Sequence, residues 1–594
     1  MRSPVLIARC LHVVLAVGCY GWATGGSGSL AVGAQLTAES LFDASRLHEI
    51  EIVIAPSDWD ALRTQARGGG FMAAFANPTA KPFSYFPAEI TVDGVRLPDV
   101  SIRKKGFLGS LDETRPSLKV KLGDQAVDSV VGFDRLTLNN NKQDPSQASQ
   151  LLAYQTFNAA GIRAPRCSLT RVSVNGQSLG VYSNVESFRR PFLAERFGSA
   201  EGALYEGTLA DFHPRSLAKF EAKTDIEAAS SPYLKRLVRM LESADDLTLE
   251  QIESVVDVDA FLDFWALESL LGFWDGYTNN QNNFFIYRDP QNDKFYFMPW
   301  GADGCFTHGG GPFARMSGGR HAEALHVNAI LPHRLYQIAG IPQRYQATME
   351  KLLDKIWNVD ELCGEVDRIE RLTRDELHPE QVAAAGSAPM GMPALTSETV
   401  KQFIRGRAAQ IRKELAETPL QIAERPRKPM YVLDVGEASG KFRTTWNHAE
   451  GDGNQAELDL KLDGEEVKLK QVTASARPLP SFGFGPPRGE GASEPPALIE
   501  IRGVRGKDER PVSLTLMVDR NVVADAHAQP FDVGGSFSEQ NGWGFGMGMG
   551  GKMLAGSLTL DKAGFNDGDV LKGSFEATIF EMHGGMFERG DPPR

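Results

Sequence analysis

Carboxylate and amide side chains gather in one stretch near the middle of the chain. Asp275 begins a run of oxygen-bearing residues, Asn280 follows five positions later, and Asn283 stands just before an aromatic segment that ends close to Asp303. Phosphoryl transfer needs such a set: one aspartate orients the acceptor hydroxyl, while an Asn and a second Asp hold Mg²⁺ against the nucleotide phosphates. Asp and Asn beside turns also act as simple caps, so a structural role stays open.

A second group of candidates lies earlier and carries positive charge. Arg103, Lys105 and Gly106 open a glycine-containing stretch, and Lys119 and Lys121 follow on the next predicted strand. Glycines let backbone N–H groups approach an anion, and the cations would neutralise phosphates. The stretch matches neither the Walker A pattern nor GxGxxG, and solvated lysines on a strand are common. A phosphate site and an ordinary polar surface both fit these residues.

The segment between Asn283 and Asp303 predicts a β-hairpin. Its two aromatic runs, 284–288 and 294–298, flank a connection at 289–293 whose residues all favour turns. A hairpin brings its two ends together, so we expect Asn283 and Asp303 to be neighbours in space.

Alternation of apolar and polar residues predicts an antiparallel sheet in the first part of the chain. The expected strands are 49–54, 88–92, 100–103 and 118–122. A helix over about 146–160 follows. Strands return over 169–186 through Asn175-Gly176, which is a strong hairpin signal.

Helical periodicity dominates the part of the chain that must position Asp275. Residues 231–273 are expected to be helical, with Asp257 or Asp259 as an N-cap, and Asp275 leaves the end of this segment. Further helices are predicted over 342–377 and 397–417.

The composition changes after a Pro/Arg-rich linker at 424–429. Short alternating strands separated by Gly, Pro and Asp turns predict an all-β sandwich over 430–594. Two stretches of biased composition inside it, 478–496 and 542–553, are interpreted as surface loops.

Length and charge narrow the function class. At 594 residues, with 42% hydrophobic and 23% charged residues, the chain predicts two or three folded units. The net charge of −13 argues against a general nucleic-acid binder, which needs a basic footprint. Cys167, Cys305 and Cys363 allow at most one disulfide, fit no zinc pattern and are interpreted as buried small hydrophobes.

The first 34 residues predict a secretory signal peptide. Positive charges precede an apolar run, and small residues before Gln35 offer a cleavage site after Ala34. The apolar run is shorter than the ~20 residues of a membrane span, so no span is expected in the mature chain. Lipid attachment at Cys19 is disfavoured, because the apolar residue of that motif stands one place too early. We therefore expect a secreted, periplasmic or cell-surface protein.

Several motifs occur in the order seen in one known family. The matching stretches are Ile102–Gly106 (an arginine-glycine loop), Pro116–Leu122 (a lysine strand), Leu136–Ser146, Val172–Glu186, Asp275–Tyr287 and Pro299-Trp300. Together they resemble the spore coat protein H (CotH) family of atypical kinases. The resemblance spans roughly residues 45–310, and the order of the motifs is more specific than any one of them.

The resemblance implies an α+β fold, with a kinase-like core of an antiparallel N-terminal sheet and a helical C-lobe. The core would occupy 35–425, including a helical extension over 330–420, and the β-sandwich would occupy 426–594.

The resemblance also implies binding of ATP with Mg²⁺ or Mn²⁺ and phosphorylation of a protein substrate. Lys119 would hold phosphates, Asp275 and Asp303 would serve catalysis, Asn283 would share the metal with Asp303, and Glu186 would orient Lys119. Asn280 would be a third metal ligand. The residues expected at the nucleotide are Lys121, Arg103, Lys105 and Gly106.

Two positions depart from the family pattern. The family usually reads Pro-Trp-Asp-x-Asp after the hairpin, whereas this chain has Gly301 in place of the first Asp and keeps Asp303. Weaker metal binding or a pseudokinase would follow if the lost carboxylate is the ligand. Lys105 stands where the family prefers Arg, which keeps the charge but not the bidentate geometry.

Three functions remain in view. The first is a secreted kinase that phosphorylates protein hydroxyls at the cell surface, envelope or coat. The second is a non-catalytic structural or adhesion protein of the envelope, in which the β-domain binds a surface partner. A hydrolase has little support, because the chain has no His-Glu-x-x-His.

Overall fold

The computed structural model describes most of the chain. The described residues are 35–65, 81–107, 109–127, 130–224, 227, 230–243, 247–309, 322–385, 394–417, 419–448, 454–479, 496–506, 510–518, 520, 530–539 and 552–584. The predicted signal peptide lies outside them, as do most of the predicted loops at 478–496 and 542–553.

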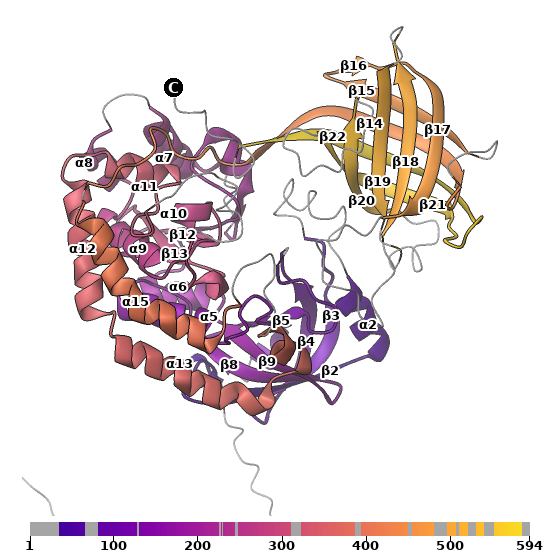
Figure 1. The fold of residues 1–594 in the computed structure, drawn as a ribbon. Coiled ribbons are helices and arrows are strands. Elements are labelled where there is room, and N and C mark those ends of the chain that lie inside the picture. Colours follow the sequence, from indigo (N-terminus) through magenta and orange to yellow (C-terminus); the bar gives the residue numbers. More distant parts are fainter. Residues whose placement is uncertain are drawn as a thin grey trace, which may run out of the picture.

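Seven strands close into a barrel in the N-terminal part of the chain (Figure 1). Their order around the barrel is β2 (Leu47–Ile54), β3 (Phe86–Val92), β4 (Val95–Lys105), β5 (Ser117–Leu122), β7 (Arg135–Asn139), β9 (Gln177–Val185) and β8 (Cys167–Val174). Successive residues of a strand face opposite sides of the sheet. In β2, the inward-facing Ile50, Ile52 and Ile54 help to fill the interior of the barrel, and the residues between them face outward.

The predicted strands are confirmed, and so is the turn between β8 and β9. Asn175 and Gly176 both take positive φ, as a two-residue hairpin of this twist requires. The sheet is closed rather than open, because β2 pairs in parallel with β8. A pattern of period two shows which face of a strand is buried, but it does not show which strands pair.

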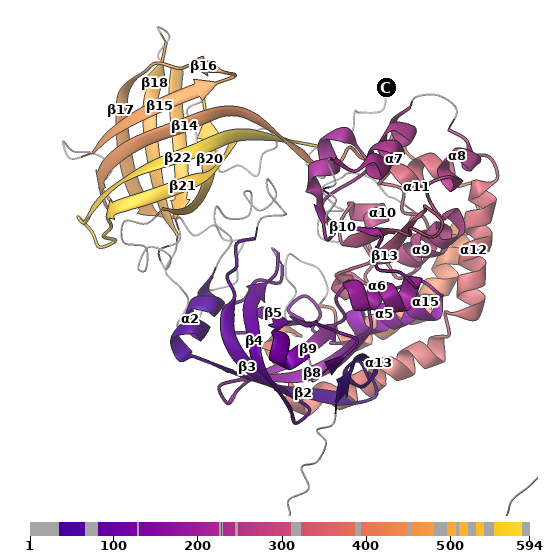
Figure 2. The ribbon, with the colours of Figure 1, turned by 180° about the vertical axis from the view of Figure 1, so that it is seen from behind.

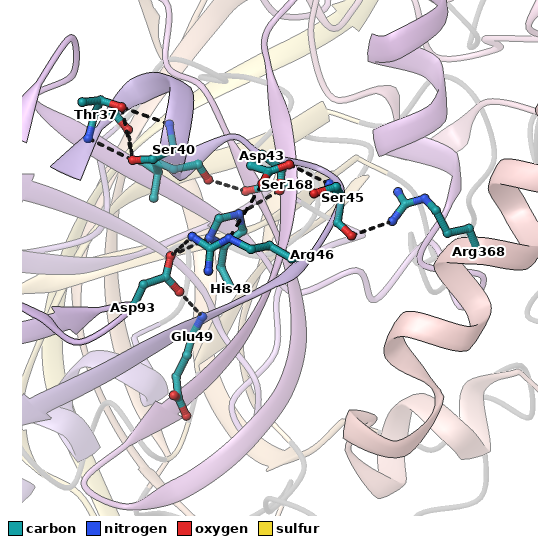
Figure 3. A network of polar contacts seen from close by, with 11 residues as sticks. Thr37, Ser40, Asp43, Ser45, Arg46, His48, Glu49, Asp93, Ser168 and Arg368 are labelled. Carbon is teal, nitrogen blue, oxygen red and sulfur yellow. Dashed lines mark hydrogen bonds and ion pairs between the residues drawn. The ribbon is translucent and has the colours of Figure 1, made fainter. Parts of the chain in front are cut away.

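Polar contacts fasten the segment before β2 to the barrel, and Figure 3 shows this network. The buried His48 contacts the Asp93 carboxylate through Nδ1 at 2.7 Å and the Asp43 carbonyl through Nε2 at 2.9 Å. Arg46 also binds Asp93, at 2.7 Å. The short elements here are β1 (Leu36–Thr37), which pairs with β6 (Val130–Val131), α1 (Ala38–Leu41), α2 (Pro56–Thr64) and α4 (Asp124–Val127).

A helical lobe follows, built around a four-stranded sheet in the order β11 (Phe220–Ala222), β10 (Ala203–Gly207), β12 (Phe284–Arg288) and β13 (Phe295–Pro299). Its helices are α5 (Ser149–Ala159), α6 (Arg190–Phe197), η1 (Pro214–Lys219), α7 (Pro232–Glu242), α8 (Leu249–Glu253), α9 (Val258–Leu270), α10 (Tyr277–Asn280), η3 (Ala302–Gly304), α11 (Ile330–Tyr336), α12 (Ile341–Lys355), α13 (Val359–Thr373), η4 (Arg374–Glu376), α14 (Pro379–Ala384) and α15 (Ser397–Leu415). The predicted hairpin is β12 and β13.

The helix expected over 231–273 is three helices, which corrects that prediction. Ser231, Thr248 and Asp257 each cap a new helix, at the starts of α7, α8 and α9. A cap side chain satisfies backbone N–H groups only at a helix start, so three caps divide the segment. The apolar residues of all three helices still reach the core, and α9 is buried on every side from Phe264 to Leu270.

Helix α13 runs from the helical lobe to the barrel in both ribbon views (Figures 1 and 2). Glu365 accepts a hydrogen bond from Gln155 of α5 at 3.1 Å, and Arg368 donates to the Ser45 carbonyl at 3.3 Å. Just beyond its end, Glu376 pairs with Arg171 of β8 at 3.2 Å. These contacts fix the barrel against the helices.

The C-terminal part is all-β, as predicted. It is one antiparallel sheet of nine strands in the order β16 (Glu465–Glu466), β15 (Gln455–Leu462), β14 (Tyr431–Thr445), β22 (Val570–His583), β21 (Lys552–Lys562), β20 (Phe531–Ser538), β19 (Arg510–Val518), β18 (Ala497–Arg505) and β17 (Leu469–Pro478). The expectation of two facing sheets is therefore wrong. The sheet curls until Trp446 bridges Ala476 at the end of β17, so that one sheet encloses its own core.

Two smaller predictions concern cysteines and membrane spans. Cys167, Cys305 and Cys363 are all free and buried, as expected. Among the described residues, no helix has both the length and the apolar character needed to span a membrane.

Candidate active site

Asp275 lies in a cage of amide groups in the loop that follows α9. Its Oδ1 accepts hydrogen bonds from Asn280 Nδ2 at 2.6 Å and Asn282 Nδ2 at 3.1 Å, and its Oδ2 accepts one from Asn283 Nδ2 at 2.8 Å. Amide donors stabilise the ionised carboxylate and fix its orientation.

The β12–β13 hairpin brings Asn283 to the residues that follow β13. The Trp300 N–H donates to the Asn283 carbonyl at 3.0 Å, which holds the two ends of the hairpin together as predicted. Gly301 follows in the left-handed region, at φ 55°. Asn283 uses its Nδ2 on Asp275, so its Oδ1 faces the other way: a Cβ on Gly301 would lie 2.9 Å from that oxygen.

Asp303 lies in η3, directly after this junction. Burial raises the pKa of Asp303 to about 6, and the charge of Lys105 opposes the rise. Burial likewise raises the pKa of Asp275 to about 6; the amide donors oppose this, while the charge of Asp303 adds to it. The two carboxylates therefore lie close enough to repel each other electrostatically.

Two lysines of the barrel complete the candidate site: Lys105 interacts with Asp303, and Lys119 interacts with Lys105. Lys105, at the end of β4, donates to Asn139 Oδ1, and burial lowers the pKa of Lys105 to about 8 although Asp303 acts to raise it. Lys119 lies on β5 opposite Arg103 of β4, and burial lowers the pKa of Lys119 to about 7. Cations in such surroundings gain strongly from an anionic ligand.

Glu206 of β10 is a carboxylate that acts on both lysines, and it was not among the residues expected at the site. Its charge raises the pKa values of both Lys119 and Lys105. Glu206 also pairs with Lys223 at 2.5 Å, and Lys223 pairs with Glu221 at 2.8 Å. The sequence carries no signal for Glu206, because β10 joins the site through its pairing with the distant strand β12.

The expected partnership of Glu186 with Lys119 is wrong. Glu186 is buried and binds Arg166 through both oxygens, with Arg166 Nε at 3.0 Å and Nη2 at 2.5 Å. The Arg166 N–H donates to the same carboxylate at 3.0 Å. These contacts hold the start of β8 to the end of β9 and occupy both carboxylate oxygens.

Known proteins with similar sequences establish the family of this chain. The family model described as CotH kinase protein matches residues 102–411, slightly more than half of the chain. The chain belongs to this family. The invasin CotH3 of Rhizopus delemar is 29% identical to this chain, and the match covers 28% of this chain and 31% of the invasin. The inner spore coat protein H of Bacillus subtilis is 24% identical, and the match covers 39% of this chain and 65% of that protein. The chain thus spans about a third of the first invasins it matches.

A solved structure, described as a Helicobacter pylori proinflammatory kinase CtkA, matches 51% of this chain and 95% of its own chain. The identity is 10% and the TM-score 0.25, an overlap too low to establish a shared fold.

The CotH motif positions differ in how closely they join the site. Asp275, Asn283 and Asp303 come together with Lys105, and Lys119 joins them through its interactions with Lys105 and Glu206. Two expected members face elsewhere. The Asn280 Oδ1 accepts from Arg427 at 3.2 Å, which takes it away from a metal position, and Lys121 is exposed on β5.

The remaining motif residues shape the loop and its support. Gly106 has φ 136°, and a Cβ there would lie 2.9 Å from Ser110 Oγ, so this turn requires glycine. Arg103 lies over the ring of Tyr85, 5.4 Å from its centroid.

Asp144 is a second residue that was not expected at the site, although it stands inside a matched motif. It is fully buried, accepts from the Ser149 N–H at 2.8 Å, and burial raises its pKa to about 7. The charge of Asp303 contributes to that rise. Asp144 lies five residues before α5 and binds the first N–H groups of that helix, close enough to Asp303 for the two charges to interact.

The donor set suits a hard cation that keeps water ligands. Within the described residues, no three His, Cys, Asp or Glu side chains form a metal cluster. Mg²⁺ is usually bound by one or two carboxylates together with substrate phosphates, so Asp303 and the Asn283 oxygen fit it, and a dedicated protein cage is not required.

Proposed function

We propose that this protein is a secreted kinase that transfers the γ-phosphoryl group of ATP to a protein hydroxyl. One observation carries the proposal: Lys105, from the barrel, and Asp303, from the helical lobe, act on each other's ionisation. Cations suited to phosphates thus face carboxylates suited to a metal and a hydroxyl. Membership of the CotH family and its kinase description support the same reaction.

The residues divide the chemistry as follows. Lys119 and Lys105 would bind the phosphates, and Asn283 with Asp303 would hold Mg²⁺. The cation would supply neutralisation of charge on the β- and γ-oxygens when bound. Asp275, ionised and held by three amides, would orient the acceptor hydroxyl and take its proton. The hydroxyl oxygen bonds to the γ-phosphorus as the bond to ADP breaks.

The proposed setting is the cell surface, envelope or coat. The predicted signal peptide and the relatives named as invasin and spore coat protein support export. The acceptor would then be a protein of that layer, and the β-domain would attach to a surface partner.

The test is labelling of the protein itself or of a casein-like acceptor by γ-labelled ATP with Mg²⁺ or Mn²⁺. We expect the wild type to label and Asp303→Ala to lose most of the signal. Asp354→Ala, on the exposed surface of α12, is the matched control and should label normally. Absence of labelling by the wild type with either metal would refute the proposal.

Gly301 favours a second candidate, a non-catalytic envelope or adhesion protein. A family carboxylate is missing at the position that lies against Asn283. Thermal unfolding with nucleotide separates the two functions, because a ligand at a hundredfold excess over its Kd adds about 2.7 kcal/mol of stability. A scaffold without a nucleotide site would show no shift with ATP and Mg²⁺.

A further inference from the structure

The segment that leaves the helical lobe returns to the loop of Asp275 before it enters the β-domain. Helix α15 ends at Leu415 and β14 begins at Tyr431. Between them, the Arg427 N–H donates to the Asn328 carbonyl at 2.9 Å, and the Arg427 carbonyl accepts from Gln281 Nε2 at 3.0 Å. The backbone of this linker is thus bound directly to the candidate catalytic loop.

The Arg427 side chain is directed into the same loop. Its Nη2 donates to Asn280 Oδ1 at 3.2 Å, and its Nε and Nη2 both donate to Gln281 Oε1 at 3.3 Å. Burial lowers the pKa of Arg427 to about 10, whereas the carboxylates of Asp211 and Asp275 favour its charge. The guanidinium therefore lies among amides with two carboxylates close enough to act on it.

A guanidinium can only donate, and this fixes how the two amides are turned. With its oxygen on Arg427, Asn280 must direct Nδ2 toward Asp275, where it makes the 2.6 Å hydrogen bond. Gln281 must likewise direct Nε2 toward Asp211, at 2.8 Å. A reversed Asn280 would set an oxygen against the Asp275 carboxylate.

The loop needs an external hold because its backbone is strained. Gln281 and Asn283 have φ values of 54° and 51°, in the left-handed region. This conformation carries a steric cost for a residue with a Cβ, and the cost is larger for Gln281 than for Asn283, because asparagine adopts the left-handed region more readily. The Arg427 contacts and the hairpin contact of Asn283 offset part of that cost.

The linker residues just after Arg427 are held by contacts with the barrel and with the helical lobe. Met430 is buried against Leu209, and Phe107 of the glycine-containing loop and Met582 of β22 pack on this pair. The next residue, Tyr431, stacks with His213 and receives the Arg215 guanidinium 4.9 Å from its ring centroid. Arg427 is therefore delivered to the loop on a fixed path.

We propose that Arg427 is a positioning residue of the active site, supplied by the interdomain linker, which sets the amide of Asn280 toward Asp275. The inference rests on the proposed kinase function. It also places a working residue outside the stretch matched by the family model, which ends at 411. The CotH core of this chain would then depend on the linker for full activity.

The test uses the full chain with Arg427→Met, Arg427→Lys and the control Arg425→Met, whose side chain is exposed two residues away. We expect Arg427→Met to lower kcat about tenfold, the cost of losing one hydrogen bond that supports a charged group. KM for ATP should stay within about twofold, since the phosphate-binding lysines are untouched. Arg427→Lys should fall between, because lysine keeps the charge but lacks the planar guanidinium that holds both amides in a fixed geometry.

The split between kcat and KM, together with thermal unfolding, separates positioning from a loss of stability. A variant that is only destabilised loses activity in proportion to its unfolded fraction, which thermal unfolding measures. Arg425→Met should keep the wild-type kcat. An unchanged kcat in fully folded Arg427→Met would overturn the proposal.

Hydrogen exchange of the backbone amides of residues 276–283 tests whether Arg427 holds the loop, and the measurement does not require kinase activity. We expect faster exchange in Arg427→Met and in Arg427→Lys than in the wild type and Arg425→Met. Equal exchange in all four proteins would overturn the proposal. If the wild type labels no acceptor, the proposed kinase function fails, while the exchange comparison still decides whether Arg427 positions the loop.

Discussion

Four ionisable side chains at the site have pKa values that move toward neutrality from opposite directions. Burial raises those of Asp275 and Asp303 to about 6 and lowers those of Lys119 and Lys105 to about 7 and 8. Each burial cost falls when the opposite charge is brought close. The site is thus poised for a ligand that supplies both a cation and an anion, such as a metal–nucleotide complex.

These directions predict a bell-shaped dependence of kcat/KM on pH. The carboxylates ionise as pH rises through about 6, which should increase the rate; the lysines lose their protons above about 7 to 8, which should decrease it. Phosphorylation rates at limiting ATP from pH 5 to 9 would measure this. Lys119→Arg keeps its charge and should shift the alkaline limb upward. A flat wild-type profile would contradict the prediction.

Gly301 predicts a gain of function on restoring the family residue. A side chain there meets the Asn283 amide, so Gly301→Asp would add a carboxylate beside the Asn283 oxygen. We expect a several-fold lower Mg²⁺ concentration for half-maximal activity. The positive φ should cost about 1 kcal/mol of unfolding free energy, since Asp tolerates this region better than most residues. The Asn283 side chain must also shift, because the added Cβ would lie 2.9 Å from its Oδ1.

The control for this change is Gly301→Asn, which has the same shape and backbone tolerance but no charge. It should lose similar stability and leave the Mg²⁺ requirement where it was. If both variants changed the requirement equally, the effect would be steric, and the carboxylate argument would be wrong.

At the scale of elements, strand β10 supplies the carboxylate partner of Lys119 that was expected at the end of β9. Glu206 of β10 acts on Lys119, whereas Glu186 at the end of β9 is held by Arg166. The four-stranded sheet of the helical lobe therefore positions the carboxylate that acts on the lysines proposed to bind phosphate. It also positions the residues proposed to bind the metal. The barrel carries the lysines but does not carry their carboxylate partner.

This assignment predicts that Glu206→Gln weakens ATP binding. Without the Glu206 charge, the pKa of Lys119 should fall further below its usual value, and more of Lys119 should be neutral at pH 7.5. KM for ATP should rise several-fold at pH 7.5 and recover toward pH 6. Titration with a fluorescent ATP analogue at both pH values would measure the change independently of turnover.

Glu186→Gln is the matched comparison. It breaks the contact with Arg166 and should lower the unfolding free energy by about 1–3 kcal/mol, while KM for ATP stays near that of the wild type. The reverse result, with ATP binding lost in Glu186→Gln and kept in Glu206→Gln, would restore the pairing expected from the sequence.

At the scale of the whole molecule, the β-domain has a buried cluster of its own. The cluster of the helical lobe takes in Leu169 and Val181 from barrel strands β8 and β9, whereas the cluster of the β-domain shares no residue with that of the lobe or that of the barrel. The β-domain meets the rest of the described residues through a small cluster around Met430 and Leu209 and through the ring of Tyr431. Separate cores predict separate unfolding transitions.

Calorimetry of matched core variants tests this prediction. Leu514 lies in the β-domain core and Leu267 in the helical-lobe core, and both are fully buried. Each Leu→Ala change should cost about 2–5 kcal/mol in its own transition. Leu514→Ala should leave the stabilisation by ATP and Mg²⁺ intact. A single wild-type transition that both changes shift equally would show that the cores unfold together.

Local sequence patterns determined the elements that hold the catalytic loop. The aromatic runs around 289–293 form the hairpin, Asp257 caps α9, and Asn175-Gly176 forms its turn. The backbone preferences and apolar periods behind these features act within a few residues. That is why the residue pattern alone was enough to place Asn283 beside the start of η3.

Tertiary structure alone decided which charges meet at the site. Glu206 reaches the lysines because β10 pairs with β12, a strand far from it along the chain. Arg427 reaches Asn280 across 147 positions. The curled sheet and the parallel closure of the barrel likewise depend on strand pairing. Such contacts depend on how whole elements pack against one another. A local pattern of residues along the chain therefore does not predict them.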